Sequence, residues 1–283
     1  MTAFAPRADV EPVFEIRPAH GFPWPNLKEL WEHRGLFRFL VWRDIKVRYA
    51  QTLLGLAWVV LQPLFSMAIF AFVFGRLVRV PSDGAPYPLF VLVALTLWIN
   101  FAGAVSGASG SLVGHAQMIG KVYFPRPYIP LAQVCASLFD TLVALLLLVP
   151  VLLALGVKPS PWAILVIPPA VGVMFLAAAG VGSSLAALNL RYRDIRYAVP
   201  FMIQVWMFAS PVVYPVSIVP SHLRLLFAIN PMVGVIESCR ATLLRTPPPD
   251  LWLTAVSATS AVVLFVSGIV YFRWSERSFV DAA

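Results

Sequence analysis

The chain has 283 residues, of which 60% are hydrophobic and 12% are charged, and its net charge is +8. Soluble domains average about 25% charged residues, so the composition excludes an ordinary soluble domain and indicates an integral membrane protein. We interpret the uneven positive charge as a signal of membrane topology and not of nucleic-acid binding. Cys135 and Cys239 are the only cysteines, and neither they nor the four histidines follow a metal-binding spacing.

The first 50 residues predict a polar tail followed by a helix on the membrane surface. Residues 1–26 are rich in proline and charge, which predicts an irregular cytoplasmic tail. Residues 27–48 alternate apolar and basic side chains, which predicts an amphipathic interfacial helix with a possible break at Gly35. No apolar segment of a cleavable signal peptide is visible here, so we expect the first span to act as the insertion signal.

Uncharged runs then predict an all-α fold with six transmembrane helices, because about 20 apolar residues cross a bilayer. Residues 217–246 are apolar but interrupted by charges, which favours a re-entrant outer hairpin before the last helix. Residues 273–283 form a short C-terminus. The six spans together with this hairpin make up a transmembrane domain over residues 49–272, with spans at about 53–74, 88–107, 129–155, 162–188, 198–216 and 251–272.

The distribution of Lys and Arg predicts the orientation of these spans. With six spans, 15 of the 21 Lys and Arg residues fall on the side that holds both termini. Positive residues accumulate on the cytoplasmic side of membrane proteins, so both termini are predicted to be cytoplasmic.

Four stretches, in the same order, resemble one known family. They are RDIKVRYAQTLLGLAWVVLQPL at 43–64, KVYFPRPYIPLAQV at 121–134, NLRYRDIRYAVPFMIQVWMFASPVVYP at 189–215 and NPMVGVIESCRATLL at 230–244. Together they are similar to the ABC-2-type permeases, specifically the bacterial polysaccharide and polyol-phosphate exporters. This resemblance extends over most of the chain.

The resemblance implies the permease of an ATP-driven exporter that moves a lipid-linked O-antigen, capsule or teichoic-acid-type polysaccharide across the bacterial inner membrane. It also implies a homodimer with two copies of a separate ATPase subunit, which binds ATP and Mg²⁺. The chain itself has no phosphate-binding G-x-x-x-x-G-K-S/T motif, so we expect no enzyme activity and no cofactor in it. The alternatives are an ABC-2 drug or lipid exporter, a membrane-embedded glycan transferase and a passive channel.

Two predicted spans carry an amide between aromatic residues on one helical face, at positions i, i+3 or i+4, and i+7. Aromatic rings and amides together suit a sugar chain, because rings contact apolar sugar faces and amides bond hydroxyls. Ordinary helix packing is the alternative. The candidate conduit residues are Trp58, Gln62 and Phe65, then Phe201, Gln204 and Phe208, with Trp98 and Asn100 as weaker candidates.

Basic residues near the cytoplasmic face fall into two groups. In the interfacial helix, Arg43, Lys46 and Arg48 are predicted to receive the anionic head group of the lipid carrier, although lipid anchoring also explains them. In the loops 114–127 and 190–197, the resemblance implies contacts that couple the permease to the ATPase, and positive-inside charge is the alternative. The coupling candidates are His115, Gln117, Lys121, Arg126, Arg191, Arg193, Asp194 and Arg196.

Two further features concern charges within apolar sequence. Asp140 lies inside the third predicted span, where a charge is costly, and we interpret it as a structural or gating contact in preference to a proton site. Glu237 and Arg240 are spaced i, i+3 and are predicted to pair on the outer hairpin. The resemblance implies that these two residues, together with Tyr214, belong to an outer gate, and a surface plug without a gating role is the alternative.

Overall fold

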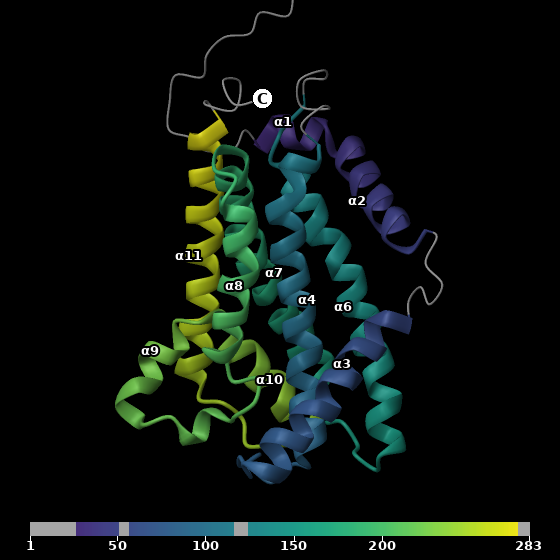
Figure 1. Ribbon diagram of the computed structural model, residues 1–283, viewed down its shortest axis with the longest axis vertical. Coiled ribbons are helices and arrows are strands. Elements are labelled where there is room, and N and C mark those ends of the chain that lie inside the picture. The colour runs from purple at the N-terminus through teal and green to yellow at the C-terminus, as the bar shows by residue number, and fades with distance from the viewer. Residues whose placement is uncertain (1–26, 51–56, 116–123, 277–283) are drawn as a thin grey trace, which may run out of the picture.

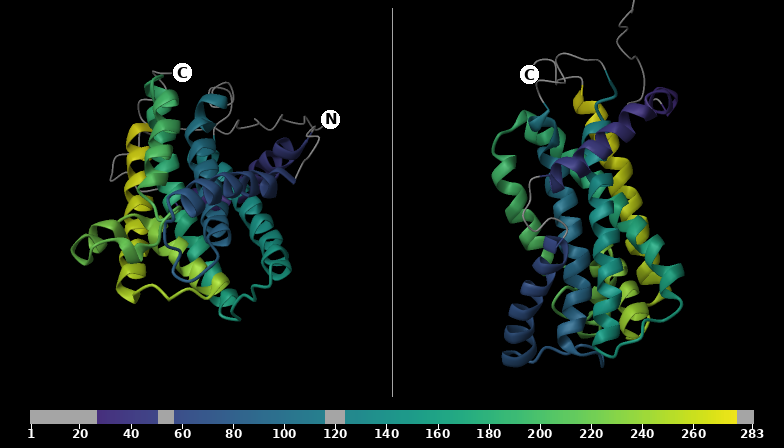
Figure 2. Two further views of the ribbon diagram at one scale, coloured as in Figure 1. Left: turned by 60° about the horizontal axis from the view of Figure 1, so that its bottom comes forward. Right: turned by 90° about the vertical axis from the view of Figure 1, so that its right-hand side faces the viewer.

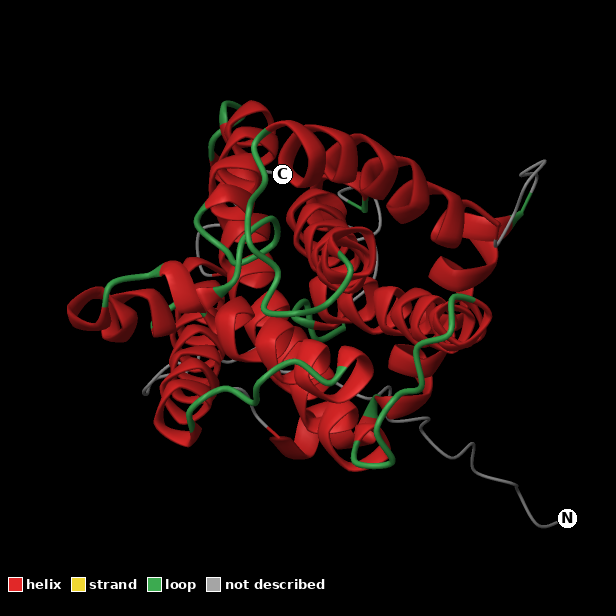
Figure 3. Ribbon diagram, turned by 90° about the horizontal axis from the view of Figure 1, so that it is seen from below, coloured by secondary structure: helices red, strands yellow, loops and turns green. Residues whose placement is uncertain are grey.

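The protein is represented by a computed structural model that describes residues 27–50, 57–115 and 124–276. Within these ranges every regular element is helical, as the sequence predicts (Figure 3). The predicted tail, the start of the predicted first span, the loop residues 116–123 and the last residues 277–283 lie outside the described part.

Five helices in the described part are long and apolar enough to cross a membrane. They correspond to the predicted spans 1, 2, 3, 4 and 6, and they form one bundle (Figure 1). They are α3(Ala57–Phe70) with its π-helical continuation η1(Ala71–Leu77), α4(Tyr87–Gly114), α6(Tyr128–Ala154), α7(Ala163–Arg191) and α11(Leu251–Glu276).

The predicted fifth span is shorter than expected. Its helix, α8(Ile195–Phe208), has 14 residues and is therefore about 21 Å long, which is less than the hydrocarbon thickness of a bilayer. Residues 209–216 are apolar but contain Pro211 and Pro215, and proline disfavours continuation of a helix. A six-span arrangement therefore stays a prediction, with α8 as the short member.

The amphipathic N-terminal segment forms two helices, α1(Leu27–Glu32) and α2(Arg34–Tyr49). The break falls at His33 and not at Gly35, because the His33 carbonyl accepts the N–H groups of both Leu36 and Phe37 and so begins the turn of α2. Leu40 is buried against α6. The same helix also carries the exposed apolar side chains of Phe39, Trp42 and Val47, which suit a helix at a membrane surface.

The core of the bundle lies along α4, in which all residues from 89 to 98 are buried. α4 packs against α6 on one side and α7 on the other. α7 approaches its neighbours closely because it presents small residues: a Cβ atom on Gly182 would lie 2.6 Å from the Cβ of Ala108, and one on Gly180 would overlap the Leu264 carbonyl of α11. Small residues allow such close backbone approach in membrane bundles.

The region predicted as an outer hairpin, residues 217–246, contains four short helices, and its re-entrant path stays a prediction. They are η2(Val216–Ile218), η3(Ser221–Leu223), α9(Arg224–Ala228) and α10(Pro231–Leu244). α9 projects sideways from the bundle (Figure 1, Figure 2). α10 is packed among α4, α7 and α11 and buries nearly all of its residues. Asn230 caps its N-terminus by accepting the Met232 N–H at 3.1 Å through its side chain, and Pro231 is its first residue, a combination that favours helix initiation.

Interactions between distant segments define the two ends of the bundle. At one end, which we call the α2 end, the Tyr128 hydroxyl donates to the Leu30 carbonyl, and Arg126 donates to the Glu276 carbonyl at 3.2 Å. At the other end, the α10 end, the Ser160 N–H donates to the Thr242 carbonyl at 2.8 Å. The first and last described helices therefore share the α2 end, as the predicted topology requires.

Candidate functional site

The helix α3 presents a largely exposed face. Only Pro63 of its 14 residues is buried. Trp58 and Phe65 are 52% and 63% exposed, and Gln62 lies exposed on the same face. Within the described part of the chain, the Gln62 side chain has no hydrogen-bond partner. This face is therefore accessible to another molecule.

The helix α8 has the same character. Its one buried residue is Val199. Phe201 and Phe208 are 68% and 50% exposed, and Gln204 is exposed between them. Both triplets singled out in the sequence thus lie on exposed faces, and their contact with a substrate stays a prediction.

The two candidates on α4 differ from each other. Trp98 is only 3% exposed, and its ring packs 5.4 Å from Phe101 and 6.3 Å from Trp206. It belongs to the core and does not face an open surface. Asn100 is half-buried and donates to the Thr96 carbonyl at 2.7 Å, which leaves its amide oxygen available to a ligand.

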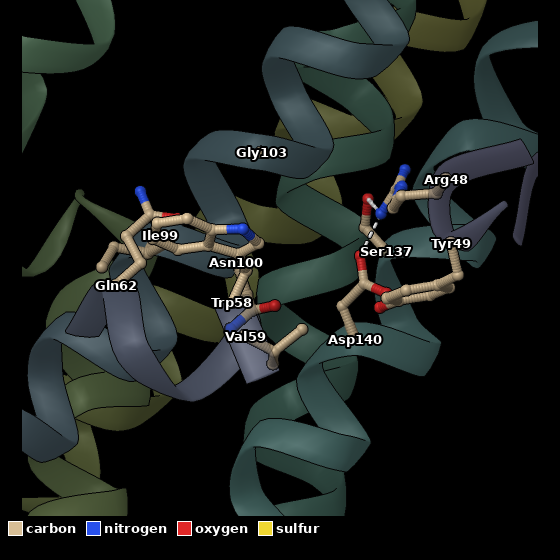
Figure 4. A pocket seen from close by; sticks show the side chains of 10 residues that line it. All are labelled: Arg48, Tyr49, Trp58, Val59, Gln62, Ile99, Asn100, Gly103, Ser137 and Asp140. Atoms are coloured by element: carbon tan, nitrogen blue, oxygen red, sulfur yellow. Dashed lines mark hydrogen bonds and ion pairs between the residues drawn. The ribbon is translucent and has the colours of Figure 1, made fainter. Parts of the chain in front are cut away.

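A cavity of about 420 Å³ brings several candidates together (Figure 4). It lies between the end of α2, the start of α3 and the middle of α4 and α6, and its volume is within the range of about 300–1,000 Å³ typical of small-ligand sites. Trp58 and Gln62 line it from α3, opposite Arg48 and Tyr49 (Figure 4). Its polar lining comprises Arg48, Tyr49, Gln62, Asn100, Ser137 and Asp140.

Asp140 is held by α2 through this cavity. Its carboxylate oxygens accept hydrogen bonds from the Arg48 guanidinium and the Tyr49 hydroxyl, and the Ser137 hydroxyl accepts from Arg48 at 3.3 Å. A charge within a membrane bundle is tolerated when it is paired, so the ion pair explains why an aspartate can stand in α6. Burial, together with the hydrogen bond to Asp140, raises the pKa of Tyr49, so its hydroxyl stays protonated and donates.

The sequence indicated Asp140 and Arg48 separately, but it did not indicate Tyr49 or Ser137 as site residues. Ser137 lies at i−3 from Asp140 and therefore shares its helical face, which is a signal that the sequence does contain. Tyr49 follows Arg48 directly, but no local pattern connects it to a residue of α6. Its role depends on a contact with Asp140, which is 91 positions away in the sequence.

The basic residues of α2 are mostly engaged within the chain. Arg43 donates to Asp44 at 2.8 and 3.0 Å, and Asp44 also accepts from the Gln133 amide of α6 at 2.8 Å. Arg48 is paired with Asp140. Of the three residues predicted to receive a head group, Lys46 alone is exposed and without a partner among the described residues.

Some of the predicted coupling residues are bound within the chain, some are exposed, and two lie outside the described residues. His115 lies 2.6 Å from the Arg43 guanidinium through Nε2 and 2.7 Å from the Ser111 carbonyl through Nδ1, which assigns the proton to Nδ1. Arg126 pairs with Glu276. The exposed group lies in and beside the turn between α7 and α8 and comprises Arg191, Arg193, Asp194 and Arg196. Gln117 and Lys121 lie outside the described residues.

The predicted pairing of Glu237 with Arg240 is confirmed, at 3.1 Å, but the pair lies in the core and not on the surface of the hairpin. The Arg240 guanidinium donates to the Phe90 carbonyl at 3.1 Å and to the Val212 carbonyl at 2.8 Å. It also lies 3.4 Å from the centre of the Phe90 ring. Arg240 therefore joins α10 to α4 and to the segment after α8.

The remaining gate candidate, Tyr214, donates its hydroxyl to the Phe208 carbonyl at 2.8 Å, and its ring packs 6.1 Å from Phe227. A neighbouring contact that the sequence did not indicate centres on Asn230. Its side-chain oxygen accepts from the Trp206 indole at 3.0 Å, and its amide nitrogen donates to Ser210 at 2.8 Å. The gating role of these residues stays a prediction, but together they attach the end of α8 to the start of α10.

Comparison with known proteins finds one family over most of the chain. The sequence profile of the family described as ABC-2 type transporter matches residues 35–244. The chain is 30% identical over 250 residues to an O-antigen export system permease protein, RfbA, of Myxococcus xanthus, which covers 87% of this chain and 94% of that protein. It is 29% identical to an RfbA of Klebsiella pneumoniae, over 84% and 91% of the two chains. It is 21% identical to a polysialic acid transport protein, KpsM, of Escherichia coli, over 85% and 93%.

Proposed function

Since the chain belongs to the ABC-2 type transporter family, we propose that it is the permease of an ATP-driven exporter of lipid-linked polysaccharide. The α2 end then faces the cytoplasm of a bacterium, and the α10 end faces the outer side of the inner membrane. The relatives named for O-antigen export and for polysialic acid transport favour a glycan over a drug as the substrate.

The observation that carries this proposal is the pair of open faces on α3 and α8. Gln62 and Gln204 are exposed on these faces, and neither has a hydrogen-bond partner among the described residues. An amide in contact with lipid costs free energy, because it gives up its hydrogen bonds to water. A second copy of the chain would enclose both faces around an aqueous passage. In that homodimer the amides bond sugar hydroxyls and the aromatic rings contact apolar sugar faces.

We assign ATP hydrolysis to two copies of a separate subunit. The sequence has no motif of its own for ATP phosphates, and the exposed turn between α7 and α8 offers a charged surface at the α2 end. Arg191, Arg193 and Arg196 on this turn also agree with a cytoplasmic position, since positive residues gather on that side. A partner that docks here could transmit its closure directly to α8 and so to the conduit.

Deletion of the gene in its own bacterium tests the proposal. We expect the surface polysaccharide to disappear and lipid-linked glycan to accumulate inside the cell, because synthesis continues while export stops. Sugar analysis of the cell surface and of cytoplasmic membranes measures both, and a plasmid copy of the gene restores export. Unchanged surface polysaccharide with new drug sensitivity would instead identify a drug exporter. Loss of glycan without internal accumulation would point to a transferase.

A further inference from the structure

We propose that the cavity between α2, α3, α4 and α6 is a binding subsite for a neutral sugar unit of the transported glycan. The inference rests on the proposed function and extends it, because it assigns a specific part of the substrate to specific residues. The carrier phosphate is not the ligand expected here. The residues that carry the argument are Arg48, Trp58, Gln62, Asn100, Ser137 and Asp140.

The charge of the cavity favours a neutral ligand. Arg48 and Asp140 are the two charged residues that line it, and they form an ion pair. The lining therefore has no net positive charge to attract an anion. A phosphate group that approached Arg48 would also meet the Asp140 carboxylate, and like charges repel strongly away from bulk water. A sugar hydroxyl, in contrast, can donate to Asp140 and accept from Arg48 at the same time.

The uncharged lining suits a sugar ring. Trp58 is 52% exposed and forms one wall, so its ring offers a flat apolar surface to the C–H face of a sugar. Neither the C=O nor the NH₂ group of the Gln62 side chain forms a hydrogen bond among the described residues. Asn100 uses only its NH₂ group, which donates to the Thr96 carbonyl. A planar aromatic wall with two amides and one carboxylate around it provides shape and hydrogen bonds together.

The depth of the cavity supports a position on the transport route. Asp140 lies 12 residues beyond Tyr128, the first residue of α6, which is about 18 Å along the helix. An ion pair at such a depth requires surrounding protein or water. A cavity of about 420 Å³ provides room for both water and a sugar. Trp58 and Gln62 also belong to the open face of α3, so the cavity adjoins the proposed conduit.

Saturation-transfer NMR on the purified full-length chain in nanodiscs tests the subsite. The probes are free glucose, mannose, rhamnose and N-acetylglucosamine, with sodium pyrophosphate as competitor. We expect transfer to at least one sugar, a signal at least fivefold lower in Trp58→Ala and in Gln62→Leu, and an unchanged signal in Trp58→Phe, which keeps an aromatic wall. Trp162→Ala is the matched control, because Trp162 is exposed but lies at the other end of the bundle. Pyrophosphate at equal concentration is expected not to displace the sugar.

No transfer to any of the sugars, an equal signal in wild type and Trp58→Ala, or displacement by pyrophosphate would overturn the subsite. These outcomes are distinct from failure of the proposed function. If only the subsite is wrong, the sugar signal is absent or does not change in Trp58→Ala, while the gene deletion still abolishes surface polysaccharide and lipid-linked glycan still accumulates inside the cell. If the proposed function is wrong, the deletion itself leaves surface polysaccharide unchanged.

Discussion

Substitution of Arg240 by methionine is expected to destabilise the folded protein by about 3–5 kcal/mol, which is the usual cost of removing one partner of a buried ion pair. The change leaves Glu237 buried and without its cation. It also removes the donors to the Phe90 and Val212 carbonyls, which lie on two other segments of the bundle. The measurement is the midpoint of thermal unfolding in detergent, followed by the loss of the monodisperse peak in size-exclusion chromatography.

Two controls separate the buried pair from a general effect of losing an arginine. Arg76→Met removes an exposed arginine at the end of η1 and is expected to leave the midpoint unchanged. The double variant Glu237→Gln with Arg240→Met removes the stranded carboxylate charge and should recover part of the loss. If Arg240→Met unfolds at the same temperature as the wild type, Arg240 does not join α10 to α4 in the way described.

Substitution of Gly180 by alanine is expected to cost about 3 kcal/mol, at the upper end of the usual cost of overpacking, because the added methyl group meets backbone and not a flexible side chain. A Cβ on Gly180 would overlap the Leu264 carbonyl, and one on Gly268 would overlap the backbone of Gly180 in turn. The two helices α7 and α11 would have to separate to accept either methyl group. The same unfolding measurement detects the change.

The matched control lies on the same helix. Gly172 also stands within α7, but no atom lies within 4 Å of the position that its Cβ would take. Gly172→Ala is therefore expected to show no loss, and a small gain is expected because alanine favours helix over glycine by about 1 kcal/mol. Equal midpoints for the Gly180 and Gly172 variants would contradict the close contact between α7 and α11.

Local sequence patterns predicted the long helices well and the end of α8 poorly. The uncharged runs around α4, α7 and α11 extend beyond 20 residues, and Asp140 is the one charged residue within α6, so mean hydropathy alone identifies all four helices. After Phe208 the apolar residues continue, but the helix does not, because Pro211 and Pro215 interrupt it. Mean hydropathy does not detect the end of this helix, because it measures how apolar a segment is and not whether the segment is helical.

Partners of buried charges were harder to predict than the charges themselves. The cost of Asp140 in a span marks it as unusual, but Arg48 is 92 residues away and no spacing rule connects them. The i, i+3 spacing predicted the pair of Glu237 and Arg240 correctly. The sequence does not show that the pair is buried, because the Phe90 and Val212 carbonyls that accept from Arg240 are brought together only in the folded chain. Local periodicity thus indicates neighbours on one helix, whereas the cavity is assembled from four helices.

The most direct test of the exporter account is glycan movement in sealed vesicles that contain the purified permease, with and without its ATPase subunit. Lipid-linked glycan supplied on the face where the ATPase is bound is predicted to become protected from added glycosidase. This protection should require both proteins and ATP, and it should stop when ATP hydrolysis is blocked. Protection that develops with the permease alone and without nucleotide would contradict the account.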